Sequence, residues 1–188
     1  MTSEEILIKL AKSGDGKAFE QIVKLYEKAV YNSALYITKN REDALDISQE
    51  VFIKLWRTLP SYRGEASLKT WIATITKNCS IDYIRARNQK QTASLTFGED
   101  EKEIDVIDRS MSSDPQKSLE QKELGAAIKK AVTSLDEPLR QTLILREFHG
   151  LSYLEIANLL KISEGTVKSR ISRGREQIKD FLKRGNFL

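Results

Sequence analysis

The chain has 188 residues, and 31 lysines and arginines against 27 aspartates and glutamates give it a formal net charge of +4. Its residues are 40% apolar and 31% charged, a globular balance that excludes wholesale disorder and fibrous repeats, while the length excludes a large multidomain enzyme. No window approaches the roughly 20 apolar residues of a membrane-spanning helix, and the first residues lack an apolar export segment. We therefore expect a soluble protein of the cytosol.

Apolar residues return at steps of three and four along most of the chain, which predicts an all-α fold. Strand-like alternation is scarce. One face of an early helix is marked by Ala18, Ile22, Leu25, Ala29 and Tyr36, and one face of the next helix by Ala44, Ile47, Val51 and Leu55. We expect both faces to point into a core.

The segment 43–56, DALDISQEVFIKLW, forms an amphipathic helix whose polar side presents Asp46, Gln49 and Glu50. Paired carboxylates can serve catalysis or bind a metal. However, no histidine or glycine-rich phosphate loop accompanies them, so a solvated or protein-docking face is favoured.

The next segment, 60–71, reads PSYRGEASLKTW: a break, a glycine-containing loop, and Ser67 as the cap of a helix that reaches Arg87. Tyr62, Arg63 and Trp71 bring aromatic rings beside a cation, a combination suited to stacking unpaired bases. Trp71 is equally well explained as a core residue. Four cations along the helix can meet phosphates: Lys69, Lys77, Arg85 and Arg87.

Charge is distributed unevenly along the chain. Residues 54–90 hold eight basic and two acidic residues, a net charge of +6, and residues 161–184 hold eight and three, a net charge of +5. Between them, residues 91–118 lose the helical periodicity and hold seven acidic and three basic residues, a net charge of −4. We interpret the chain as two small helical domains joined by a flexible acidic linker.

The segment 151–173 has the pattern of a helix-turn-helix. Ser152 and Glu155 form a capping box for its first helix, Ser163 caps the second, and Val167 and Ile171 anchor the second helix against the first. The outward side carries donors suited to phosphates and to guanine in a major groove: Thr166, Lys168, Ser169, Arg170, Ser172 and Arg173. The alternative is a two-helix corner with a cationic exterior.

Two isolated residues have structural explanations. His149 precedes Gly150 at a predicted helix C-terminus, where histidine is favourable without chemistry. Cys79, the only cysteine, cannot form an internal disulfide, and we expect it to be a small buried residue.

Four segments stand in order along the chain: DALDISQEVF, YRGEASLKTWI, NCSIDYIRAR and GLSYLEIANLLKISEGTVKSRISRGRE. Together they resemble the extracytoplasmic-function group of bacterial RNA polymerase sigma factors, and the resemblance covers nearly the whole chain. It implies a sigma region 2 domain over 1–90, an acidic linker over 91–118 that enters the RNA path of the polymerase, and a sigma region 4 domain over 119–188.

The resemblance also implies functional residues. Asp46, Gln49 and Glu50 would dock on the clamp helices of the largest polymerase subunit. The minus-ten element would be opened, and an unstacked base held, by Tyr62, Arg63, Gly64, Glu65, Ala66, Ser67, Lys69 and Lys77. The six outward residues of the helix-turn-helix would read the minus-thirty-five element.

The implied partners are core RNA polymerase, through its clamp helices and flap region, promoter DNA, and an anti-sigma factor that holds the protein at the membrane without membrane insertion by this chain. The resemblance implies no enzymatic activity, no cofactor and no metal. One departure from relatives is Lys161, which stands where glycine commonly closes the first helix of the motif.

Two other functions stay open from the residues alone. A dimeric helix-turn-helix regulator would bind a palindrome without polymerase. A nucleic-acid-processing enzyme would use Asp43, Asp46 and Glu50 with magnesium.

Overall fold

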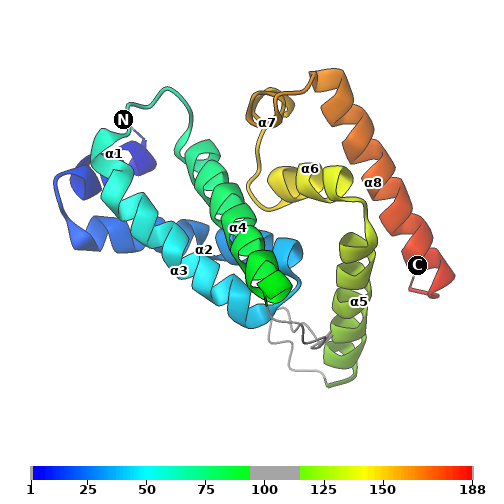
Figure 1. Ribbon diagram of the computed structural model, residues 1–188. Coiled ribbons are helices and arrows are strands. Elements are labelled where there is room, and N and C mark those ends of the chain that lie inside the picture. The colour runs from blue at the N-terminus through cyan, green and yellow to red at the C-terminus, as the bar shows by residue number, and fades with distance from the viewer. Residues whose placement is uncertain (1, 94–114, 188) are drawn as a thin grey trace.

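The computed structural model describes residues 2–93 and 115–187, with side chains for 2–89 and 123–187, and all regular elements among them are helical. Figure 1 shows their arrangement. The elements are α1 (Ser3–Lys12), α2 (Gly16–Thr38), α3 (Arg41–Thr58), the 3-10 helix η1 (Leu59–Ser61), α4 (Leu68–Ala93), α5 (Pro115–Ser134), α6 (Glu137–Glu147), α7 (Tyr153–Leu160) and α8 (Glu164–Arg184). The expected all-α fold with two helical domains is confirmed.

Side-chain caps fix where the N-terminal helices begin. Thr2 and Glu5 form a capping box for α1, Asp15 accepts from the backbone at the start of α2, and the Asn40 side chain accepts from Asp43 N at the start of α3. These acceptors satisfy backbone N–H groups that have no partner within the helix. Lys39 ends α2 in a left-handed conformation with φ of 58°.

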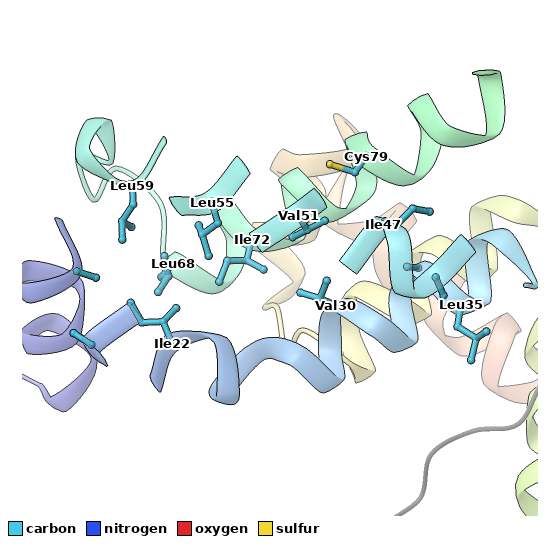
Figure 2. Packing of buried hydrophobic residues seen from close by; sticks show 14 residues of the cluster. Ile22, Val30, Leu35, Ile47, Val51, Leu55, Leu59, Leu68, Ile72 and Cys79 are labelled. Atoms are coloured by element: carbon cyan, nitrogen blue, oxygen red, sulfur yellow. The ribbon is translucent and has the colours of Figure 1, made fainter. Parts of the chain in front are cut away.

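The first core lies between α2, α3 and α4, as Figure 2 shows. It is built largely from the apolar faces expected from the sequence, including Ile22, Ile47 and Val51, together with Ile72 of α4. Leu25 and Ala29 are the exceptions on α2, because Leu25 is 62% exposed and Ala29 is only half-buried. The expectation for Leu25 was therefore wrong: it shares a helical stripe with Ile22, but no helix covers that part of α2.

The second core joins α6, α7 and α8, with Leu139, Leu143, Ile156 and Val167 among its buried residues. α8 crosses α6 closely at Gly174. A Cβ atom placed there would lie 2.5 Å from Cδ1 of Leu143, so only glycine fits without a shift.

The two cores are in contact. Ala73 of α4 belongs to the second buried cluster, and Tyr36 of α2 packs with Val132 and Ile144 in a third. Most of the predicted acidic linker, residues 94–114, lies outside the described residues. Within the described part of the chain, no helix is long and apolar enough to span a bilayer.

Candidate nucleic-acid and protein interfaces

The polar face of α3 is a solvent-exposed surface on a firmly packed helix. Asp46, Gln49 and Glu50 are all exposed. The opposite side of the helix, with Ile47 and Val51, is buried against α2 and α4. Lys54 Nζ lies 3.4 Å from Glu50 Oε1 one turn away, an exposed pair that leaves the carboxylate accessible. The face is therefore presented rigidly and is free for a protein partner.

An apolar recess continues this face along α3. The ring of Trp56 meets the ring of Phe19 from α2 edge to face, with centroids 4.8 Å apart. Together with Phe52, Ile53 and Gly16 they line a recess of about 530 Å³. This recess was not predicted from the sequence. Ile53 is out of step with the buried stripe, and that spacing was the signal that it lies outside the core.

Asp43, in the first turn of α3, braces α3 against α4. One of its oxygens accepts from Tyr83 Oη at 2.8 Å, and the other lies 2.9 Å from Arg87 Nη1. The hydrogen bond to Asp43 and burial raise the pKa of Tyr83 to about 12. Arg87, which we expected to meet phosphate, thus already has a partner. No three potential metal ligands among histidine, cysteine, aspartate and glutamate gather within 2–93 and 115–187.

The loop between η1 and α4 forms a second recess, with an aromatic wall. Tyr62 and Trp71 stack with centroids 4.8 Å apart and planes 16° from parallel. These rings and residues 61–66 line a recess of about 400 Å³. Trp71 is half-buried and packs on the first core while also lining the recess. Trp71 is therefore in part a core residue, as one explanation from the sequence had it, while its stacking on an unpaired base stays a prediction.

Three local features shape this loop. Gly64 has a φ of 78°, a left-handed conformation that glycine adopts without strain. Tyr62 Oη donates to Ala66 O at 2.6 Å and closes the loop on itself. Lys12 Nζ at the end of α1 donates to Tyr62 O at 2.6 Å. This leaves Arg63, Glu65 and Ser67 exposed at the rim.

The start of α4 adds polar groups beside the loop. Ser67 accepts from Thr70 N at 3.4 Å, as expected of a capping residue, and Lys69, the second residue of α4, is half-buried. Lys77 lies further along α4 and lines a different recess with Ile37, Arg85 and Arg140. The structure thus brings together the six predicted loop residues and Lys69, and places Lys77 apart from them.

The helix-turn-helix has the caps expected from the sequence. Ser152 and Glu155 form a capping box on α7, and Ser163 accepts from Thr166 N on α8. Lys161 takes the left-handed position at the turn with φ of 55°, so the lysine adopts the conformation that glycine would otherwise provide. Val167 and Ile171 are buried as predicted.

The outward side of α8 presents the expected donors. Lys168, Ser169, Ser172 and Arg173 are exposed, and Thr166 and Arg170 are partly so. Ser169 Oγ donates to Thr166 O at 2.9 Å. At the next turn, Arg175 forms an exposed ion pair with Glu147 of α6 at 2.6 Å.

Glu155 also contacts the first domain, which the sequence did not indicate. Its Oε1 accepts from Ser67 Oγ at 2.7 Å and from Thr70 Oγ1 at 2.8 Å, while its Oε2 accepts from Ser152 N at 2.7 Å. Desolvation acts to raise the pKa of this carboxyl, but the hydrogen bonds outweigh it and lower the pKa to about 2. Lys69 Nζ lies 3.5 Å from Oε2 and donates to Gly150 O at 3.1 Å.

His149 forms a second contact between the domains. Its Nε2 lies 2.8 Å from Ser33 Oγ on α2, and its Nδ1 has no hydrogen-bond partner. Burial lowers the pKa of His149 to about 4, so the ring is neutral at pH 7. The structure gives His149 an interdomain contact that the sequence did not indicate.

Cys79 is buried in the first core, as expected. Its Sγ lies 3.5 Å from Lys54 Nζ. Burial, helped by the nearby carboxylates of Glu50 and Asp82, raises the pKa of the thiol although this lysine acts to lower it. A buried, protonated thiol is unreactive, so its role is packing.

Two family models match the chain: Sigma-70 region 2 over residues 22–90 and Sigma-70 region 4 over residues 125–178. The chain is 33% identical to RNA polymerase sigma-H factor of Pseudomonas aeruginosa, over 93% of this chain and 91% of the relative. It is 33% identical to ECF RNA polymerase sigma-E factor of Haemophilus influenzae, over 95% and 94% of the two chains.

Solved structures show the same fold. Sigma factor RpoE of Bartonella quintana, solved with the anti-sigma factor NepR, has a TM-score of 0.70 and 28% identity, and the match covers 89% of this chain and 98% of that one. CnrH, solved with the cytosolic domain of CnrY, has a TM-score of 0.65 and 22% identity, over 97% and 98% of the chains. The two family models and the near full-length similarity to ECF sigma factors show that this chain belongs to the extracytoplasmic-function family of RNA polymerase sigma factors.

Proposed function

We propose that this sigma factor directs core RNA polymerase to promoters through three surfaces. The first is the exposed face of α3, where Asp46, Gln49 and Glu50 bind the clamp helices of the largest subunit. Its support is the exposure of all three residues on a helix whose other side is buried. Since carboxylates here face solvent with no metal-binding cluster among the described residues, protein docking explains them better than catalysis does.

The second surface is the loop from Tyr62 to Ser67, which captures an unpaired base of the minus-ten element. The observation that carries this proposal is the recess walled by Tyr62 and Trp71. Unstacking costs a few kcal/mol per step, and stacking on aromatic rings returns roughly 1–3 kcal/mol per base, so capture of bases can favour opening without ATP. Arg63, Lys69 and Lys77 add positive charge for the backbone of the strand.

The third surface is the outward side of α8, which reads the minus-thirty-five element in the major groove. Its six donors lie on a helix whose start and packing are fixed by Ser163 and Val167. The proposed domain limits are 1–90 and 119–188, with 91–118 as the acidic linker. Region 4 would meet the flap region of the polymerase, and the linker its RNA path.

An anti-sigma factor is a further proposed partner. The similar sigma factor of Bartonella quintana was solved in complex with one. We place the protein in the bacterial cytoplasm, where promoter DNA and polymerase are, with an anti-sigma factor able to hold it at the membrane.

Run-off transcription with purified core polymerase on genomic fragments tests this function. We expect initiation at defined sites that requires both core enzyme and this chain. Gln49→Ala and Glu50→Ala should each weaken core binding by about tenfold, or about 1.4 kcal/mol, as expected for interface residues that contribute more than 1 kcal/mol. Glu27→Ala, which removes an exposed glutamate of α2, is the matched control. Unchanged core binding in both α3 variants would contradict the docking surface, and operator binding without polymerase would favour the dimeric regulator.

A further inference from the structure

The two domains meet where the first domain is proposed to meet DNA. Ser67 Oγ and Thr70 Oγ1, both at the start of α4, donate to the same oxygen of Glu155 from the helix-turn-helix. Lys69 lies beside the other oxygen. Two hydroxyls, one ammonium and a helix N-terminus thus surround a single carboxylate.

The contact has a packed part as well as this polar one. Tyr36 of α2 stacks on Phe148, with ring centroids 5.3 Å apart. Next to that pair, the buried His149 bonds Ser33, and Ala73 of α4 lies among the buried side chains of the second core. Apolar burial between the same two domains therefore accompanies the polar contacts of Glu155.

A DNA phosphate would require the same donors. Carboxylate and phosphodiester are both anions that accept hydrogen bonds from hydroxyls and ammonium groups. Ser67 and Lys69 belong to the proposed minus-ten surface, and Thr70 lies one residue further along the helix. One set of donors cannot bind both anions, so this domain contact and a bound strand exclude each other.

We propose that in the free protein the helix-turn-helix domain masks the minus-ten end of α4, with the Glu155 carboxylate occupying the place of a backbone phosphate of the DNA strand. This inference rests on the proposed function of the Tyr62–Ser67 loop. It makes the free sigma factor a poor binder of unpaired DNA until the domains separate. Thr70 becomes a DNA-contacting residue in the separated state.

The ion pair in this contact is weak. The side chains of Lys69 and Glu155 are 36% and 26% exposed, so water screens their attraction. A partner that binds the open form better than the closed form shifts the equilibrium by its difference in affinity. Core polymerase, which spaces the two domains along a promoter, is such a partner.

Two substitutions test the Glu155 carboxylate and its donors on α4 independently. Glu155→Gln removes the charge but keeps a side chain that completes a capping box, so α7 stays capped. Thr70→Val removes one donor from α4 and leaves the helix-turn-helix unchanged. Glu176→Gln makes the same charge change at an exposed position of α8 and is the matched control.

Each variant is measured in two ways on the full chain. The first is energy transfer between dyes on Lys28→Cys and Lys179→Cys, both exposed positions on different domains, with Cys79→Ala. The second is the affinity for a short labelled single-stranded DNA of mixed sequence. Glu155→Gln should lower energy transfer and tighten DNA binding roughly threefold to tenfold relative to Glu176→Gln. Thr70→Val should also lower energy transfer, but without tighter DNA binding.

Added DNA should lower energy transfer in the unsubstituted chain as well. If Glu155→Gln matches Glu176→Gln in both measurements, no masking contact exists. If it opens the domains and DNA binding stays at the control value, the contact does not mask a DNA site, and the proposal is wrong. Failure of the proposed function shows separately, as absence of initiation by the unsubstituted chain with core polymerase.

Discussion

The two DNA-facing parts of this molecule are assembled from the chain in different ways. The helix-turn-helix takes its caps and its anchors from one continuous segment, from Ser152 to Ile171. The Tyr62–Ser67 recess depends on parts far apart in sequence: Lys12 holds Tyr62 from α1, and Trp71 forms a wall from α4. A continuous motif can be identified by its spacing, whereas a recess of this kind requires the tertiary structure.

The largest expected effect tests whether the continuous motif also depends on tertiary packing. Ile156→Ala empties a fully buried position in the second core and should cost about 2–5 kcal/mol of unfolding free energy, measured by chemical denaturation. Leu154→Ala, two residues away and 56% exposed, should stay within about 0.5 kcal/mol of the parent. Equal values for the two would mean that α7 is stabilised by its caps alone.

The next effect concerns the discontinuous recess. Tyr62→Ala removes the ring stacked on Trp71 and should reduce promoter opening by about 1–3 kcal/mol, the value of stacking one base. Permanganate reactivity of unpaired thymines in the complex with core polymerase measures it. Tyr62→Phe keeps the ring and removes only the hydrogen bond to Ala66 O. We expect it to disfavour promoter opening by about 0.5–1.5 kcal/mol, the net contribution of one hydrogen bond. Equal opening by all three proteins would remove the ring from the mechanism.

A pH effect tests the contact between the two domains at His149. The pKa of His149 is about 4 in the folded protein, against an ordinary value of 6.5, so below pH 6.5 the unfolded chain binds more protons. Stability should therefore fall as pH drops from 6.5 towards 4, by about 2 kcal/mol or less between pH 7 and pH 5. Glu155, whose pKa is lowered to about 2, acts in the same direction only below pH 4.5.

Thermal melts of the parent and of His149→Gln at these two pH values measure this effect. The variant lacks the titrating ring, so its melting temperature should change less between them. An identical pH dependence in both proteins would show that the ring does not control stability in this range.

The smallest effect compares local caps in the two domains. Ser163→Ala should cost about 1 kcal/mol, because Thr166 N loses its acceptor. Asn40→Ala removes the equivalent acceptor at α3 and should cost a similar amount. Ser163→Thr should restore most of the loss in denaturation experiments. A negligible cost in one domain only would show that its helix start is held by packing.

The sequence predicts much of the fold because the relevant signals are local. Apolar spacing identified Ile22, Ile47 and Val51 as core, and the caps Ser152 and Ser163 were placed correctly. Leu25 was misplaced because periodicity shows which stripe is apolar and not how much of it another helix covers. Lys161 departs from the expected glycine, and its left-handed φ shows that the turn keeps its geometry without one.

The candidate sites were predictable only in part. The residues of the loop and of α8 follow from residue type and motif, but the stacking of Tyr62 on Trp71 and the Phe19–Trp56 recess do not. The contacts of Glu155 with Ser67 and of His149 with Ser33 join residues 88 and 116 positions apart. No local pattern encodes pairings at such separations.

The two oxygens of Glu155 divide its roles. Oε2 holds Ser152 N within its own helix, and Oε1 takes both hydroxyls from α4. When the domains part, Oε1 exchanges its two hydroxyl partners for water and Oε2 loses Lys69 but keeps Ser152 N, so α7 need not melt or refold. The helix-turn-helix domain can then move as a rigid body, and activation costs the loss of the interdomain contact, including the stacking of Tyr36 on Phe148, but no refolding of the motif.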